Sequence, residues 1–168
     1  VVLDPVIFKR EIEKIKLVAP GGLKNLYVSK KAHLILPSHK AHDAASEKSK
    51  GITKIGSTLK GIGPTYMDKT GRNGLRVGDI LESNFKEKYN FLKSKHHQML
   101  KQYDFEVDEL YDEKEWFEGI EMLKTFQFIN CEYLVNEALI NNKKILAEGA
   151  QGTLLDIEYG SYPYVTSS

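Results

Sequence analysis

The five residues Val1-Val2-Leu3-Asp4-Pro5 join an apolar run directly to a helix start. The apolar side chains are typical of a short buried strand, whereas aspartate is a good N-cap and proline suits the first helical position. Phe8, Ile12 and Ile15 follow at i, i+4 and i+7 with charged residues between them, which predicts an amphipathic helix that ends before Pro20. The stretch therefore predicts a strand that leads straight into a helix.

The same alternation of strand and helix continues along the chain. Apolar runs at 26–28 and 33–36 are bounded by breakers and predict strands covered on both faces, and Pro37 begins a predicted polar helix that reaches about Lys50. Residues 144–147 predict a further strand, which runs into the loop 148–152. The pattern predicts an α/β fold with a mainly parallel sheet flanked by helices, whose ligands bind in loops beyond the carboxyl ends of strands.

The middle of the chain follows two other patterns. From Gly51 to Gly78 the periodicity disappears, so we expect a long irregular segment, and its interleaved apolar residues favour a functional rather than a disordered one. Apolar residues then recur at three- and four-residue spacing. They predict one long helix that starts near Asp79, and a second that runs from about Trp116 to Asn141.

Composition excludes several classes of function. The 168 residues include 24 basic and 23 acidic side chains, so the formal net charge of +1 gives no field that favours nucleic acid or a membrane surface. Cys131 is the single cysteine, and no apolar run is long enough to span a bilayer. We expect one domain, residues 1–168, in a reducing, cytoplasmic setting, and the absence of an initiator methionine suggests a fragment boundary.

The strongest chemical signal is the glycine-rich stretch 56–72. Glycines let backbone N–H groups approach an anion, while its hydroxyl, lysine and arginine side chains add donors and charge, as a phosphate site requires. It is not a P-loop, because Gly61 is followed by Ile62 rather than by lysine and a hydroxyl residue. A surface loop with solvated charges explains the spacing equally well.

Two further stretches carry weaker signals. In 148–153 the amide of Gln151 is able both to donate and to accept, so it suits a carbonyl or ring nitrogen, although a tight turn is the alternative. In 162–168 hydroxyls cluster as phosphate ligands do, but composition alone favours an aromatic edge strand. His39 and His42 lie three apart with no third ligand nearby, so we reject a zinc site and expect a solvated helix face. His96 is expected to pack against the interior.

Three blocks of sequence together resemble the signatures of adenylosuccinate synthetase, in the same order: Gly61-Ile62-Gly63-Pro64-Thr65-Tyr66-Met67-Asp68-Lys69-Thr70-Gly71-Arg72, then Glu148-Gly149-Ala150-Gln151-Gly152-Thr153-Leu154-Leu155-Asp156-Ile157, then Tyr162-Pro163-Tyr164-Val165-Thr166-Ser167-Ser168. The resemblance covers essentially the whole chain. It implies a P-loop-NTPase-like fold, incomplete in this chain, and a GTP- and magnesium-dependent ligase of purine biosynthesis. In that reaction GTP phosphorylates the 6-oxygen of IMP, and the amino group of L-aspartate displaces the phosphate to give adenylosuccinate.

The resemblance also implies roles for five residues. Thr58 and Thr166 match IMP-phosphate ligands, and Gln151 matches the glutamine that contacts the hypoxanthine ring near the 6-oxygen and stabilises the intermediate. Arg72 matches the arginine that reaches the IMP phosphate of the neighbouring subunit, which implies a homodimer. Lys69 matches the lysine of the same signature, with a catalytic part or a contribution to the positive potential.

The resemblance has departures and omissions as well. Leu59 and Lys60 stand where many members have Gly-Arg, which reduces local backbone freedom. The family's N-terminal phosphate loop, its aspartate-binding loop, its guanine site and its Mg²⁺ ligands have no counterpart here. We therefore expect the central segment of the enzyme, which supplies part of the IMP site and the dimer interface and is inactive alone. The alternative is a non-catalytic purine-nucleotide-binding or oligomerisation module.

Overall fold

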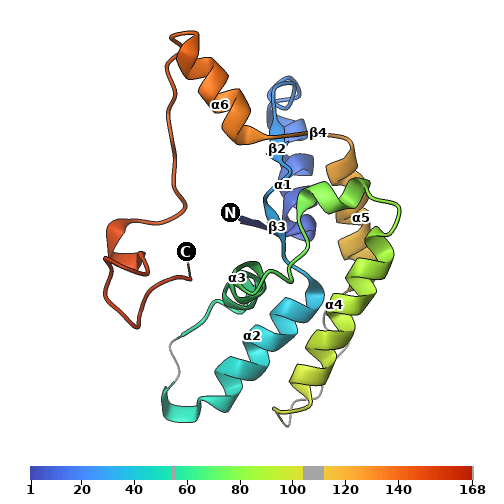
Figure 1. Cartoon of the computed structure of the whole chain (residues 1–168), viewed down its shortest axis with the longest axis vertical. Coiled ribbons are helices and arrows are strands. Elements are labelled where there is room, and N and C mark those ends of the chain that lie inside the picture. The colour runs from blue at the N-terminus through green and yellow to red at the C-terminus, as the bar shows by residue number, and fades with distance from the viewer. Residues whose placement is uncertain (54–55, 104–111, 168) are drawn as a thin grey trace.

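The computed structural model describes residues 1–53, 56–103 and 112–167. Helices and short strands follow one another in the order β1 (Val2–Leu3), α1 (Pro5–Val18), β2 (Tyr27–Ser29), β3 (His33–Leu34), α2 (Pro37–Ser49), α3 (Ile62–Thr70), α4 (Phe85–Leu100), α5 (Glu113–Lys124), β4 (Gln127–Ile129) and α6 (Cys131–Ile140). Short 3₁₀ turns lie at Gly51–Thr53, Val77–Leu81 and Thr153–Leu155. Figure 1 shows the helices around the strands, with the segment after α6 passing down one side of the molecule.

The strands pair in two parallel ladders. β1 lies beside β3, with Leu3 opposite Leu34, and β2 lies beside β4, with Val28 opposite Phe128. A helix separates the two strands of each pair in sequence, as parallel pairing requires. The prediction of an α/β fold with parallel strands is therefore confirmed.

The opening stretch folds as predicted. β1 ends at Leu3, and α1 begins at Pro5, where the side chain of Asp4 accepts a hydrogen bond of 2.9 Å from the N–H of Val6. The other carboxylate oxygen of Asp4 lies 2.7 Å from Nζ of Lys40 on α2. The N-cap of α1 thus also ties this helix to α2.

The core lies between α1, α4, α5 and the strands, with Trp116 at its centre. This side chain is fully buried, and its ring centre lies 4.7 Å from that of Tyr89, with the two rings tilted by 34°. Its Nε1–H donates to the carbonyl of Ile35 at 2.7 Å. Next to Trp116, helices α1 and α5 approach each other closely, because a Cβ at Gly119 would lie only 2.4 Å from the carbonyl oxygen of Pro5. The expectation that Trp116 belongs to the core is confirmed.

The prediction of one helix from Trp116 to Asn141 is wrong. The chain forms α5, then β4, then α6, because Gln127–Ile129 finds a parallel partner in β2. The long helix predicted from Asp79 also begins later: Val77–Leu81 is a 3₁₀ turn, in which Asp79 accepts from the N–H of Arg76 at 2.6 Å, and α4 starts at Phe85.

Two further predictions differ from the structure. The segment 51–78 is not wholly irregular, since it contains α3 between Ile62 and Thr70. Residues 144–147 form no strand, because a strand needs a neighbour to share its backbone hydrogen bonds, and no described strand lies beside them. Leu146 there is 92% exposed. Across the described residues, no helix has the length and apolar character needed to cross a membrane.

Candidate functional site

The glycine-rich loop is held against α2 by two acidic side chains. Oε1 of Glu47 accepts from the N–H groups of Gly56 at 2.7 Å and Ser57 at 3.3 Å. One oxygen of Asp43 accepts from the hydroxyl of Ser57 at 2.7 Å, and the other accepts from the N–H of Gly61 at 2.9 Å. Thr58 lies exposed between these anchor points.

The backbone of this loop is unusual at two positions. Gly61 has φ of +76° and packs so closely on α2 that a Cβ there would lie 3.0 Å from the backbone nitrogen of Lys40. Leu59 has φ of +56°, although its Cβ disfavours this left-handed conformation. This is the position at which the resembling family often has glycine, so the loop keeps the glycine-type backbone with a leucine.

Lys69 and Arg72 lie together at the carboxyl end of α3. The amide of Arg72 donates to the carbonyl of Lys69 at 3.2 Å, and Arg72 has φ of +61° with an exposed side chain. Nζ of Lys69 lies 4.9 Å from the centre of the Tyr66 ring. The two predicted cationic residues thus lie within one turn of each other, and the side chain of Arg72 is exposed.

The C-terminal segment that contains Thr166 approaches the other end of α3. Thr166 donates its N–H to the carbonyl of Leu155 at 2.9 Å, which ties it to the 3₁₀ turn that follows the Gln151 loop. A Cβ at Gly63 would lie 3.3 Å from Oγ of Ser167, so this segment contacts the first turn of α3 through Ser167. In Figure 1 the C-terminal end of the chain lies near α3. Residues 162–163 form a turn, residues 164–165 form a bend, and none of residues 162–167 belongs to a strand, so the alternative of an edge strand is wrong there.

A buried hydrogen-bond network lies beneath the loop and joins α2, α3 and α4. Asp68 accepts through one oxygen from Nε2 of His39 at 2.9 Å and from Nε2 of His96 at 2.7 Å. His96 is bonded in turn to the hydroxyl of Ser38 at 2.8 Å. His39 is fully buried and His42 is 5% exposed, so the expectation of a solvated helix face is wrong, while the expectation that His96 packs inside is confirmed.

Burial sets the charges of this network. Burial lowers the pKa of His39 to about 4, and the hydrogen bond to Asp68 only partly opposes it. Burial alone would raise the pKa of Asp68, but the hydrogen bonds from His39 and His96 outweigh it and hold that pKa well below its usual range. At neutral pH the network therefore holds a neutral His39 and an ionised Asp68. At the glycine-rich loop, the hydrogen bond that Glu47 accepts from the N–H of Gly56 lowers the pKa of the Glu47 carboxyl.

The network does not fit a metal ion. Within the described ranges, His39, Asp68 and His96 are placed closely enough to share one. However, the N–H of Leu36 donates to Nδ1 of His39 at 2.9 Å, so the single proton of the neutral ring is on Nε2, the atom that would have to ligate. Mg²⁺ also prefers six oxygen ligands. These residues therefore form a structural network.

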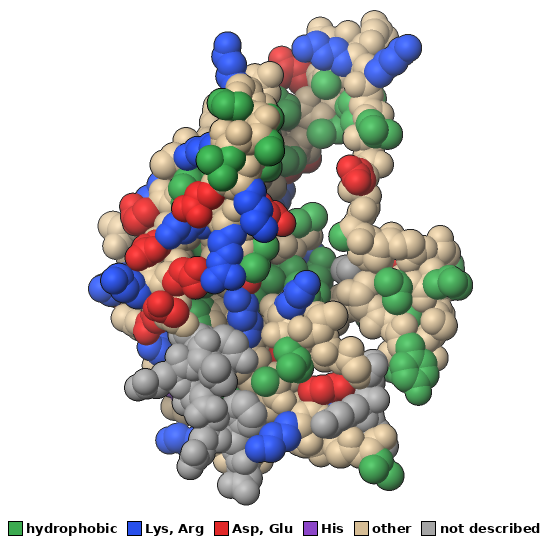
Figure 2. Space-filling model, turned by 180° about the vertical axis from the view of Figure 1, so that it is seen from behind, with side chains coloured by type: hydrophobic (Ala, Val, Ile, Leu, Met, Phe, Trp, Pro, Cys, Tyr) green, Lys and Arg blue, Asp and Glu red, His purple; other side chains and the backbone are tan. Residues whose placement is uncertain are grey.

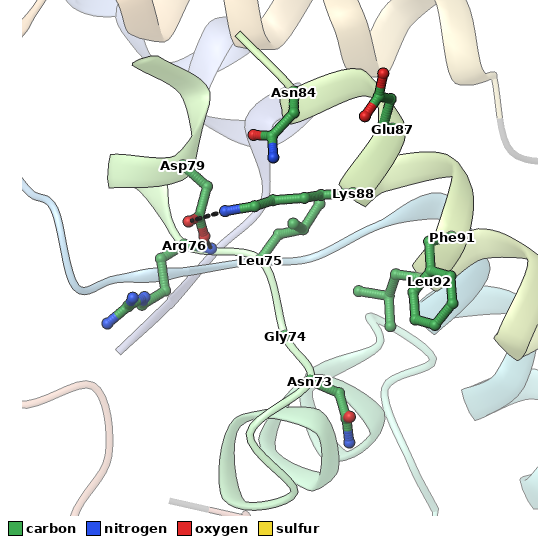
Figure 3. Close-up of a pocket in the computed structure, with 10 residues that line it drawn as sticks. All are labelled: Asn73, Gly74, Leu75, Arg76, Asp79, Asn84, Glu87, Lys88, Phe91 and Leu92. Carbon is green, nitrogen blue, oxygen red and sulfur yellow. Dashed lines mark hydrogen bonds and ion pairs between the residues drawn. The ribbon is translucent and has the colours of Figure 1, made fainter. Parts of the chain in front are cut away.

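A separate pocket of about 450 Å³ lies next to the 3₁₀ turn that precedes α4. Figure 3 shows Lys88 reaching towards Asp79 across it, with Arg76 turned away from this pair. None of the five predicted site residues lines the pocket. The face in Figure 2 carries basic and acidic side chains interspersed, which agrees with the balanced composition.

Asp43, Glu47, Asp68 and His39 are structural parts of the site that sequence reasoning missed. One signal was available: Ser38, Ala41, His42 and Ala45 follow the i, i+3, i+4, i+7 pattern of a buried helix face. On that face Ala41 and Ala45 pack against Leu100 of α4, and Ser38 is hydrogen-bonded to His96 of the same helix. Nothing local marks Asp68 or Asp43 as partners, because their hydrogen bonds join residues 14 to 29 positions apart.

Parallel strands linked by helices, with a glycine-rich loop fastened to one of the helices, place the chain in the α/β class. The sequence profile of the family "Adenylosuccinate synthetase" matches residues 1–168. The chain is 56% identical to an adenylosuccinate synthetase of Bacteroides fragilis and 57% identical to that of Flavobacterium johnsoniae, covering 100% of this chain and 40% of each relative. It also matches a solved structure, described as fully ligated adenylosuccinate synthetase from Plasmodium falciparum, with a TM-score of 0.78 and 35% identity over 96% of this chain and 38% of that one.

The chain belongs to the adenylosuccinate synthetase family. It spans 40% of the length of the curated relatives it matches. The resemblance noted in the three sequence blocks is therefore confirmed.

Proposed function

We propose that the protein containing this chain is a ligase that forms adenylosuccinate from IMP and L-aspartate, with GTP converted to GDP and phosphate. GTP transfers its γ-phosphoryl group to the 6-oxygen of IMP, and the amino nitrogen of aspartate then attacks C6 as phosphate leaves with that oxygen. The chemistry needs this order, because a purine carbonyl oxygen is a poor leaving group until it is phosphorylated. The observation that carries the proposal is the 56% identity to an adenylosuccinate synthetase over the whole chain.

In this proposal the chain supplies part of the IMP site. Thr58, presented by the loop that α2 fastens, and Thr166, in the segment that rests on α3, bind the phosphate of IMP through their hydroxyls. Gln151 binds the base near the 6-oxygen and stabilises the phosphorylated intermediate. The arrangement of the loop and the C-terminal segment at the same end of α3 supports this assignment, since it places hydroxyl-rich stretches of the chain near each other.

Two cationic residues complete the proposed site. Lys69 adds positive potential or takes a catalytic part, and Arg72 binds the IMP phosphate of the partner subunit in a homodimer. The exposure of Arg72 supports an intersubunit role, because its side chain is accessible to a second molecule. GTP and aspartate are bound mainly by parts of the protein outside this chain. We place the reaction in the cytoplasm, without nucleic acid or membrane as a partner.

Magnesium belongs to this proposal as well. It would neutralise the phosphate charges of GTP during transfer. The one group of described residues close enough to share a metal does not suit Mg²⁺, so its ligands are proposed to lie outside this chain.

The test is a product assay on the natural polypeptide that contains residues 1–168. Adenylosuccinate should form only when IMP, L-aspartate, GTP and Mg²⁺ are all present, and omission of any one should abolish it. The Thr58→Ala variant should raise the KM for IMP and leave the KM for GTP within about twofold of the unchanged protein's value, because in this proposal the lost hydroxyl binds IMP and not GTP. A folded protein that makes no adenylosuccinate from the complete mixture would overturn the proposal.

A further inference from the structure

Asp43 fastens the loop that carries Thr58 at both of its ends. It is 9% exposed, and its two carboxylate oxygens accept separately from the Ser57 hydroxyl at 2.7 Å and from the Gly61 N–H at 2.9 Å. Glu47, by contrast, contacts only the start of the loop, at Gly56 and Ser57. Asp43 is therefore the acidic side chain of α2 that closes the five-residue loop 57–61 into a ring.

The contact with Ser57 extends to the strained position of the loop. The Ser57 hydroxyl has one proton, which it donates to Asp43, and its oxygen then accepts from the N–H of Leu59 at 3.2 Å. Leu59 has φ of +56°, a conformation that a residue with a Cβ adopts only when its surroundings hold it. Two hydrogen bonds, from the N–H of Leu59 to Oγ of Ser57 and from the Ser57 hydroxyl to Asp43, form a relay that stabilises this conformation.

We propose that Asp43 is a positioning residue for nucleotide binding: it fixes the loop so that Thr58 meets the phosphate of the bound nucleoside monophosphate. The proposal rests on the function proposed above and assigns a role to a residue outside the five predicted site residues. Asp43 acts through its hydrogen bonds. Both of its oxygens accept hydrogen bonds from the loop, so its proposed effect on nucleotide binding passes through the loop.

The first test compares two variants of Asp43 in the natural polypeptide that contains this chain. Asp43→Ala removes both contacts, and we expect the KM for IMP to rise about tenfold or more while kcat changes by less than about threefold, because binding geometry rather than chemistry is lost. Asp43→Asn keeps both contacts, since its amide oxygen accepts from Gly61 and its NH₂ donates to the Ser57 hydroxyl. Its KM should stay within about threefold of the unchanged protein.

A second readout does not depend on activity. Hydrogen–deuterium exchange of the Gly61 amide, measured without ligand, should be at least about tenfold faster in Asp43→Ala than in the unchanged protein, and close to unchanged in Asp43→Asn. If the unchanged protein does not turn over IMP, the proposed function fails. The exchange at Gly61 then still reports whether Asp43 holds the loop.

A third variant tests the link to Leu59. Leu59→Gly removes the strain that the relay opposes, so in that background the Asp43→Ala change should raise the KM for IMP by less than about threefold. This non-additivity would support the proposal even if Asp43→Ala alone is poorly folded. Asp43→Ala with unchanged KM and unchanged Gly61 exchange would overturn it. So would Asp43→Asn with a KM as high as that of Asp43→Ala, because charge rather than hydrogen bonding would then explain the effect.

Discussion

At the scale of single residues, Leu59 has a backbone conformation that suits glycine better. A residue with a Cβ in the left-handed region destabilises the folded state by about 1–2 kcal/mol. Glycine avoids this strain, but its more flexible unfolded chain makes folding less favourable by about 0.5–1 kcal/mol. We therefore expect Leu59→Gly to raise the free energy of unfolding by about 0.5–1 kcal/mol in urea denaturation. Leu59→Ala is the control, since it removes the half-exposed side chain but keeps the Cβ. Equal free energies of unfolding for Leu59→Gly and Leu59→Ala would show that the backbone of residue 59 is not strained.

His39 provides a second prediction at this scale, for the dependence of stability on pH. Its pKa is lowered to about 4 in the folded state by burial and is about 6.5 when unfolded, so the unfolded chain binds the extra proton between these values. This contribution to stability is complete above pH 6.5 and is lost as the pH falls towards 4. We expect a loss of up to about 3 kcal/mol across that window.

The measurement is urea denaturation at several pH values between 7 and 4. His39→Gln, which is uncharged throughout, should show a clearly shallower fall in unfolding free energy than the unchanged protein, whatever its stability at pH 7. The depressed pKa of Asp68 acts below this window, because its contribution is lost only under pH 3.8. Identical slopes for the two proteins would show that His39 does not titrate as described.

Residue-scale prediction from the sequence succeeded where the cause was local. Asp4 caps its helix because the capping oxygen and its N–H partner are two residues apart. His39 was predicted to be solvated and is buried, because the partner that makes its burial tolerable, Asp68, comes from another helix. The roles of Thr58, Gln151 and Arg72 came from family resemblance and stay predictions, since their ligand comes from outside the chain.

At the scale of secondary-structure elements, the contact of α1 with α5 depends on Gly119. A Cβ there would lie 2.4 Å from the Pro5 carbonyl oxygen, a backbone atom that moves only if the helices separate. Alanine favours a helix by about 1 kcal/mol over glycine, but the overpacking costs more, so Gly119→Ala should lower the free energy of unfolding by about 1–3 kcal/mol. Glu121→Ala, on the exposed face of α5, should change it by less than about 1 kcal/mol. A stabilised Gly119→Ala variant would contradict this packing.

Elements were predicted well where a local start signal marks them and poorly where a distant strand partner decides the structure. The helices at 5–18 and 37–49 follow clear start signals, and both form close to the predicted limits. The segment 127–129 was predicted as helix because the helical spacing of apolar residues on both sides of it spans from Trp116 to Ile140, yet it pairs with β2, about 100 residues earlier. A strand of three residues is specified by its distant partner, which local periodicity does not reveal.

At the scale of the whole molecule, the proposed role of Arg72 requires two subunits for each site. Arg72→Ala and Gln151→Ala should each be nearly inactive as homodimers. In a mixed dimer, one site receives a normal Gln151 from its own chain and a normal Arg72 from its partner. Random mixing of the two variants should therefore restore about a quarter of the unchanged activity. No recovery, in mixtures shown to exchange subunits, would place Arg72 outside the partner's site.

The central claim is that the 6-oxygen of IMP leaves as phosphate after it is phosphorylated by GTP. The most direct measurement supplies IMP labelled with ¹⁸O at this position, together with GTP, Mg²⁺ and L-aspartate, to the natural polypeptide that contains this chain. Mass spectrometry then follows the label. The account predicts one ¹⁸O in the inorganic phosphate for each adenylosuccinate formed. Adenylosuccinate formed with unlabelled phosphate, or a folded protein that forms none, would contradict it.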